Sequence, residues 1–158
     1  MSASSKIAMP HFTRLPQTLY RIQPKLPVAL RSFQDQTAKG RSSFDLTLRG
    51  GLVHPVEIGS PFVGPNGCSL RPAGDNLTRI LSTYKGVPLI YRLHEGLQLP
   101  EGLIVFHEHT DHWSLQTTKP IDLRELNAMI TELLKSMPPP QTREQFFEMM
   151  GDEDDQDN

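Results

Sequence analysis

The sequence has a single cysteine, Cys68, in 158 residues, and no apolar run approaches the roughly 20 residues that a membrane-spanning helix needs. One cysteine excludes a disulfide bond within the chain and favours a reducing compartment. The amino terminus also lacks the apolar stretch of a secretory signal peptide. We therefore expect a soluble, intracellular protein of the cytoplasm that has no membrane contact.

Aromatic residues are scarce as well, at 7% of the chain, whereas 37% of the residues are hydrophobic and 22% are charged. A chain of this length and composition suits one globular domain and is too short for two. The net charge of −2 conceals an asymmetry, because the residues from Met137 onward carry seven acids and one base. The rest of the chain has a charge of +4, which attracts a phosphorylated small molecule but is too weak to indicate nucleic-acid binding.

Both ends of the chain lack hydrophobic periodicity. Residues 1–16 carry serine and proline, which predicts a disordered N-terminal segment. Residues 137–158 begin with Met137 and three prolines and continue with acids, which predicts a disordered acidic tail. In that tail at most a short docking patch is expected, formed by Phe146, Phe147, Met149 and Met150. The folded domain is therefore expected between residues 17 and 136.

The domain is predicted to belong to the α+β class, with several strands and few helices. Apolar positions at helical spacing predict one helix from Pro72 to Gly86 and a second that is capped by Asp122 and ends before Met137. β-Branched and aromatic residues predict strands at 18–23, 68–71, 87–93, 103–107 and 112–117. Residues 43–48 are either another strand or a short segment that covers a cleft.

Residues 107–116 hold three of the six histidines and the only tryptophan of the chain. Apolar residues lead into this stretch and an alternating pattern leaves it, which predicts a β-hairpin. We expect one face of its second strand to line a cleft and the other to pack in the core. Alternation assigns His112, Ser114 and Gln116 to the first face and Trp113 and Leu115 to the second.

A metal site is an alternative interpretation of the same stretch. His107, His109, Asp111 and His112 match the HxHxDH pattern of metallo-β-lactamase-like hydrolases in residue type and spacing. Those enzymes complete their sites with further histidines downstream, whereas no histidine follows His112 here. Three of the four groups would suffice to hold a zinc ion. A further alternative is that all of them are solvated polar residues at a turn.

Several segments, taken in order, resemble one known family. They are Leu19-Tyr20-Arg21, Gly64-Pro65-Asn66-Gly67-Cys68-Ser69-Leu70-Arg71-Pro72, residues 96–103, the stretch 107–116 with Lys119-Pro120-Ile121, and the leucine-rich last helix. Residues 19–134 are similar to the fungal relatives of an NAD-dependent ADP-ribosyltransferase-like toxin family, whose bacterial members are effectors of type VI secretion systems. The resemblance implies a compact fold in which two small mixed sheets hold NAD in the split between them.

The resemblance also implies roles for individual residues. Arg21 would hold a phosphate or ribose of NAD, and Arg71 is the second phosphate candidate. Ser69 would orient the nicotinamide ribose, while the backbone of Asn66 and Gly67 approaches the amide of the ring. From the residues alone, Arg21 equally suits a strand end that covers apolar surface, and Ser69 suits the end of a turn. The full set of expected NAD contacts is Arg21, Asn66, Gly67, Ser69, Arg71, Ser114 and Gln116.

The implied reaction breaks the bond between nicotinamide and ribose, and positive charge develops on the ribose. ADP-ribosyltransferases use a glutamate on a later strand, and here that strand offers none on its cleft-facing side. Glu108 is the nearest acid, and the pattern leaves open which side of the preceding strand it faces. We assign the role of polar partner to Glu108 or His112, with His109 near the mouth of the site. The expected catalytic residues are Arg21, Ser69, Glu108 and His112.

The expected function is that of a toxin that cleaves NAD and transfers ADP-ribose to an unknown protein or nucleic-acid acceptor, with an immunity protein as a further partner. Two alternatives stand beside it. One is the metal-dependent hydrolase described above, and the other is a non-catalytic module that binds a partner through its proline-rich junction and acidic tail. The tail also motivates the hypothesis that it folds over a basic cleft and limits the access of NAD.

Overall fold

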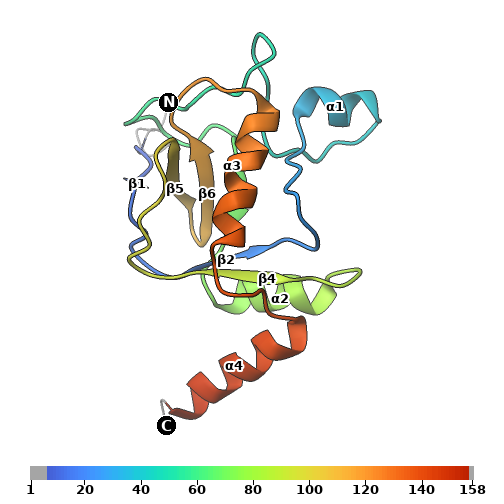
Figure 1. The fold of residues 1–158 in the computed structure, drawn as a ribbon, viewed down its shortest axis with the longest axis vertical. Helices are drawn as coiled ribbons and strands as arrows, with labels where there is room; N and C mark the ends of the chain where they lie inside the picture. The colour runs from blue at the N-terminus through green and yellow to red at the C-terminus, as the bar shows by residue number, and fades with distance from the viewer. Residues whose placement is uncertain (1–6, 157–158) are drawn as a thin grey trace.

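The computed structural model describes residues 7–156, with side chains described through Gly151. These residues form a mixed α+β domain with a four-stranded sheet, a two-stranded sheet and four helices, which confirms the predicted fold class (Figure 1). None of the helices in this range has the length and apolar character of a membrane span. In chain order the elements are β1 (His11–Phe12), β2 (Leu19–Ile22), α1 (Phe33–Ala38), β3 (Cys68–Leu70), α2 (Asp75–Thr83), β4 (Ile90–Leu93), β5 (Leu103–His109), β6 (His112–Thr117), α3 (Leu123–Lys135) and α4 (Arg143–Gln156).

The four-stranded sheet has the strand order β1-β5-β6-β3, and all of its pairs are antiparallel. Its central pair, β5 and β6, is the hairpin predicted from the alternation of residues, although β5 continues to His109. At the turn, Thr110 has a φ of 43°, which is a left-handed conformation. A register shift between His107 and His109 marks a β-bulge. The bulge changes which way the side chains beside the turn face.

The two-stranded sheet pairs β2 with β4 in antiparallel register. Within residues 7–156, backbone pairing joins the two sheets at one bridge, between Tyr20 of β2 and Arg71 just after β3. Beyond the bridge, β2 continues along β4 while β3 continues along β6, so the sheets diverge. The expected split between two small sheets is present, but both sheets are antiparallel and not mixed.

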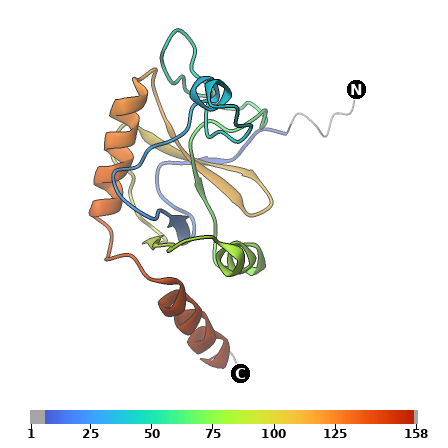
Figure 2. The ribbon, with the colours of Figure 1, turned by 90° about the vertical axis from the view of Figure 1, so that its right-hand side faces the viewer.

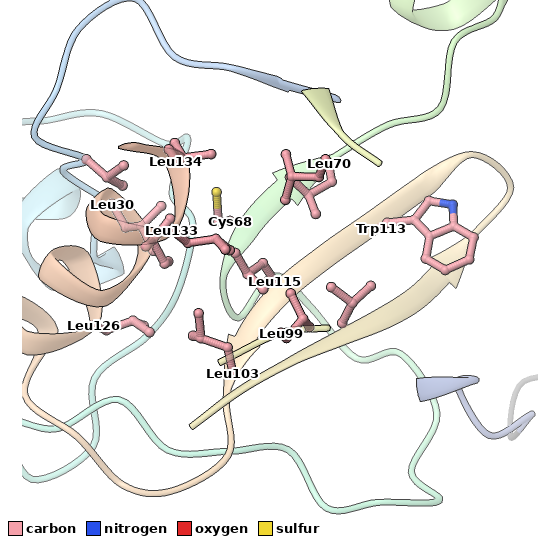
Figure 3. Packing of buried hydrophobic residues seen from close by; sticks show 14 of the residues in the cluster. Leu30, Cys68, Leu70, Leu99, Leu103, Trp113, Leu115, Leu126, Leu133 and Leu134 are labelled. Carbon is pink, nitrogen blue, oxygen red and sulfur yellow. The ribbon is translucent and has the colours of Figure 1, made fainter. Parts of the chain in front are cut away.

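Helix α3 covers one face of the four-stranded sheet and forms the main core with it (Figures 2 and 3). The predicted cap is present, since the side chain of Asp122 accepts a hydrogen bond from the backbone N–H of Arg124. Each fully buried leucine or isoleucine stabilises the fold by about 1.5–3 kcal/mol. This face of the sheet therefore belongs to the core, and the buried stripe of α3 consists of Leu126, Ile130, Leu133 and Leu134.

The C-terminal segment is ordered where the sequence predicted a disordered tail. Gln141 exchanges two backbone hydrogen bonds with Ile90 of β4, and α4 begins two residues later. Phe146 is fully buried and packs edge to face on Tyr20 of β2, with ring centroids 5.2 Å apart. The predicted docking patch thus exists, but it holds this segment against β2, β4 and α2. Four large apolar side chains offset the entropy cost of ordering this short helix. The high content of acids in the segment led to the prediction of disorder.

The prediction of disorder was also wrong for residues 7–16, while residues 1–6 lie outside the described residues. Met9 and Leu15 are buried, and β1 adds an edge strand beside β5. Such contacts leave no periodic pattern, because one or two side chains make each of them. Residues 43–48 form no strand, and Leu46 instead makes an isolated parallel bridge with Ser32. Ser32 caps the N-terminus of helix α1, which the sequence did not predict.

Two predicted elements are shorter than expected. Helix α2 begins at Asp75 and not at Pro72, and β4 begins at Ile90 and not at Val87. Pro88 lacks the N–H that a strand pairing uses, which explains why β4 begins after it.

Candidate active site

Ser69 and His112 meet across the pairing of β3 with β6. The antiparallel register sets Ser69 opposite Ser114, and side chains two residues apart on a strand share a face. His112 therefore lies diagonal to Ser69, and its Nε2 is hydrogen-bonded to the Ser69 Oγ at 3.2 Å. The structure thus brings together two of the predicted catalytic residues.

Glu108 lies on the side of His112, which answers the question that the sequence left open. Its carboxylate Oε1 is 2.6 Å from the His112 Nδ1, and the Glu108 side chain is 1% exposed. The two groups are not aligned as a linear hydrogen bond, and neither carboxylate oxygen has another hydrogen-bond partner among the described residues. We interpret the short distance as a pairing of the two groups, because a buried carboxylate is stable only when it is paired or protonated. Glu108 is therefore placed to orient His112, and its predicted catalytic role stays a prediction.

Arg21 reaches across the split between the sheets. Its Nη1 donates a hydrogen bond to the backbone carbonyl of Ser69 at 3.2 Å, and its Nε donates to the Gln23 Oε1 at 3.0 Å. Bonds to described residues thus use two of the five N–H donors of the guanidinium. The remaining donors suit the oxygens of a phosphate.

A pocket of about 170 Å³ lies beside Arg21 and Ser69. It is smaller than the roughly 300–1,000 Å³ typical of small-molecule sites. Arg71 also borders it and is held by an ion pair with Asp111 at 3.0 Å. The pairing of Asp111 with Arg71 and the apolar walls were not predicted, although Leu77 and Ile80 of α2 are spaced i and i+3 and form one of the walls. The walls are formed by Tyr20, Ile22, Leu77 and Ile80.

Three of the expected NAD contacts instead form a closed network. The Asn66 Nδ2 donates to the Gln116 Oε1 at 3.2 Å and to the His54 carbonyl at 2.9 Å. The Gln116 Nε2 then donates to the Ser114 Oγ at 3.1 Å. Ser114 and Gln116 are 2% and 1% exposed, respectively. The prediction that they contact NAD is therefore not supported, because their polar groups are covered and bonded to one another.

Gly67 has a different role from the one predicted. A Cβ built at this position would lie 2.3 Å from the backbone oxygen of Leu115 and 3.0 Å from the Ser114 Oγ. The absence of a side chain is thus required by the close approach of β6, and not by a ligand. Gly67 and Asn66 do not border the pocket beside Arg21.

The four groups of the metal alternative do not converge on one point. His107 stacks on Trp113 with ring centroids 4.3 Å apart, and Asp111 pairs with Arg71. His109 stacks on His112 at 5.3 Å and lies beside a second pocket of about 360 Å³, away from Ser69. Among residues 7–156, no group of three or more histidine, cysteine, aspartate or glutamate side chains is placed to hold a metal ion. The geometry therefore does not support the hydrolase alternative.

Two neighbouring side chains belong to the core. Trp113 is 6% exposed and packs in the main cluster, as predicted from the alternation, while one of its faces carries the ring of His107. Cys68 is fully buried next to Ser69 in sequence, and burial raises the pKa of its thiol. A thiol with a raised pKa is a poor nucleophile at neutral pH, so Cys68 is a residue of the core.

A split pair of small sheets, with an arginine on β2 and a serine on β3, has the arrangement expected of an ADP-ribosyltransferase. A family model described as Tse2 ADP-ribosyltransferase toxin matches residues 17–146, and the chain belongs to this family. Neither a search of curated proteins nor a search of solved structures gives a significant match.

Proposed function

We propose that the protein is an NAD-dependent ADP-ribosyltransferase toxin that binds NAD as its substrate at the split between β2 and β3. The observation that most directly supports this is that Arg21 and Ser69 border one pocket, with the His112–Glu108 pair bonded to Ser69 through His112. Membership of the family supports the reaction class. The geometry supports the roles assigned to the residues.

In this proposal the two arginines bind the pyrophosphate of NAD. Arg21 is part of the pocket wall and has unused donors in a planar fork, which matches phosphate oxygens. Arg71 is held in place by Asp111 and adds a second positive charge. The hydroxyl of Ser69 orients the ribose that bears nicotinamide, because its hydrogen bond to His112 defines the direction of its own lone pairs.

His112 and Glu108 provide the polar partner that the sequence could not assign. As nicotinamide leaves, positive charge develops on the ribose, and negative charge nearby lowers the barrier. His112 lies between the pocket residue Ser69 and the buried carboxylate of Glu108. His112 is thus the residue placed to take up the proton of an incoming acceptor, and Glu108 stabilises it after it has done so.

The acceptor is proposed to be a protein or a nucleic acid, and an immunity protein that covers the pocket is a further proposed partner. A covering partner of this kind is consistent with a small pocket that lies at the surface between the two sheets. The acidic tail remains a hypothetical regulator of access to the site. Its helix α4 contacts Tyr20, which is also a wall of the pocket.

Nicotinamide release from NAD by the purified protein tests the proposal. Arg21→Ala should lower kcat/KM for release by about a hundredfold, because a charge-assisted contact to phosphate is worth roughly 1.5–3 kcal/mol. Arg92→Ala is the matched control, since Arg92 is an exposed arginine on the neighbouring strand β4. Absence of both NAD binding at millimolar concentration and nicotinamide release would remove the proposal.

Expression in cells separates this function from that of a non-catalytic binding module. A toxin of the proposed type should lose its growth inhibition when Arg21 or Ser69 is replaced by alanine. A module that acts through its C-terminal segment would retain its cellular effect in both variants, and would lose it when residues 138–158 are removed.

A further inference from the structure

The side chains of Glu108, His112 and Ser69 form a relay of acid, imidazole and hydroxyl. The distances are 2.6 Å from the Glu108 Oε1 to the His112 Nδ1 and 3.2 Å from the His112 Nε2 to the Ser69 Oγ. A hydroxyl within reach of a base, with the base oriented by a third group, is the signature of an activated nucleophile. Ser69 also borders the pocket, so the hydroxyl is placed where a ligand binds.

Burial determines the direction of the protons in this relay. The Glu108 side chain is 1% exposed and its Oε1 lies 2.6 Å from the His112 Nδ1, so the tautomer of neutral His112 that suits this contact carries its proton on Nδ1. The Nε2 is then an acceptor, and the hydroxyl of Ser69 donates to it. The proton of Ser69 thus points toward a base, and the oxygen lone pairs remain available to an electrophilic carbon.

We propose that Ser69 is itself an acceptor of ADP-ribose, an inference that rests on the proposed function. The Ser69 Oγ forms a bond to the ribose carbon that carried nicotinamide, and the carbon–nitrogen bond breaks with its electron pair leaving on nicotinamide. The proton of the hydroxyl passes to the His112 Nε2 and then to solvent. The step consumes NAD and one serine hydroxyl, and it requires no other reactant.

The same geometry makes the modification selective for one serine. Ser114 lies on the same face of the sheet, but it is 2% exposed and accepts a hydrogen bond from Gln116. Ser43 is exposed but has no imidazole partner in the structure. Modification of Ser69 fills the pocket and removes the hydroxyl that orients the substrate, so it limits the number of turnovers of each molecule.

The test measures both products in one sample. The full-length protein is incubated with NAD and quenched in acid, nicotinamide is quantified, and the adduct is located by mass spectrometry of the intact chain and of its peptides. We expect one ADP-ribose per chain on Ser69, through an O-glycosidic bond that survives neutral hydroxylamine. His112→Ala should slow adduct formation by about a hundredfold, the effect of removing a general base, whereas Ser43→Ala should leave it unchanged.

Glu108 is a positioning residue in this scheme, and its test uses the pH profile. Glu108→Gln keeps the shape of the side chain but removes the negative charge that stabilises a protonated His112. We expect the pH dependence of adduct formation to shift while the affinity for NAD stays the same. An unchanged pH profile with a normal rate would contradict the relay.

The outcomes separate the inference from the proposed function. Nicotinamide release without an adduct on Ser69 overturns the inference and leaves the proposed function intact. Absence of both products overturns the two together. A fluorophosphonate reacts with nucleophilic serine hydroxyls in the absence of NAD. Labelling of the wild-type protein with this reagent therefore tests the relay even if a variant folds poorly. Wild-type protein and Ser43→Ala should be labelled at Ser69, and a lack of labelling of the folded wild type overturns the relay.

Discussion

Two sets of polar side chains lie on the same face of the β3–β6 pair and differ in their partners. The first, the open chain, ends at a half-buried hydroxyl beside the pocket that Arg21 borders. In the second, the closed chain, two amides and a hydroxyl are hydrogen-bonded to one another, and Asn66 borders a separate pocket of about 420 Å³. The first consists of Glu108, His112 and Ser69, and the second of Asn66, Gln116 and Ser114. The two sets differ in their chemistry, because the first places an imidazole beside a hydroxyl at the pocket of Arg21, whereas the second pairs amides with a hydroxyl and contributes to the fold.

Loss of the imidazole in the open chain should have the largest effect. We expect His112→Ala to lower the rate of nicotinamide release by about a hundredfold to ten-thousandfold, because general acid–base catalysis has this magnitude. The variant also leaves the buried Glu108 carboxylate without its partner, so we expect a loss of stability of about 3–5 kcal/mol, and the rate is compared per folded molecule. Steady-state kinetics and thermal unfolding of the same sample make the comparison. A variant that releases nicotinamide at the wild-type rate would show that the open chain is not a catalytic site.

The second largest effect is expected from loss of the aromatic packing between Phe146 and Tyr20, the residue before Arg21. Phe146→Ala should destabilise the protein by about 3–5 kcal/mol, because it empties a fully buried position beside Tyr20. Since Tyr20 precedes Arg21 on β2, the affinity for NAD should fall in the same variant. Urea unfolding and NAD titration measure the two effects. Val87→Ala serves as the control, because the side chain of Val87 is 74% exposed.

Damage to the closed chain should be a matter of stability and not of activity. Gln116→Ala removes a buried amide and leaves Asn66 and Ser114 without their partner, at a cost of about 1–3 kcal/mol. The rate of nicotinamide release per folded molecule should remain that of the wild type. Loss of NAD binding in a variant that is still folded would instead return Gln116 to the substrate site.

The smallest expected effect is that of Cys68, a core residue, on the pH dependence of the free energy of unfolding. Burial raises the pKa of the Cys68 thiol above its value in the unfolded chain, so folding favours the protonated form. The stability from this group is therefore complete below the unfolded thiol pKa of about 8.5 and is lost as the pH rises through the folded value. Cys68→Ala should remove this part of the alkaline decline in the free energy of unfolding. Identical pH profiles for both proteins between neutral pH and pH 10 would contradict it.

Patterns that depend on neighbours along the chain were predicted well. The spacing of Leu126, Ile130, Leu133 and Leu134 predicted α3, and alternation predicted the hairpin and the core position of Trp113. The charge of the tail was a poor guide, because the burial of Phe146 outweighs it. The HxHxDH spacing also misled, since the bulge next to His107 turns the four groups toward different partners.

The sequence by itself determined the α+β class, the boundaries of the main helix and the strand face on which His112, Ser114 and Gln116 lie, because each follows from the period of a strand or helix. Only the tertiary structure decided the side of Glu108, the closure of the Gln116 network and the docking of α4 on β2. These outcomes depend on which distant segment covers a surface, and the free energy of covering a surface is not encoded in the spacing of its own residues.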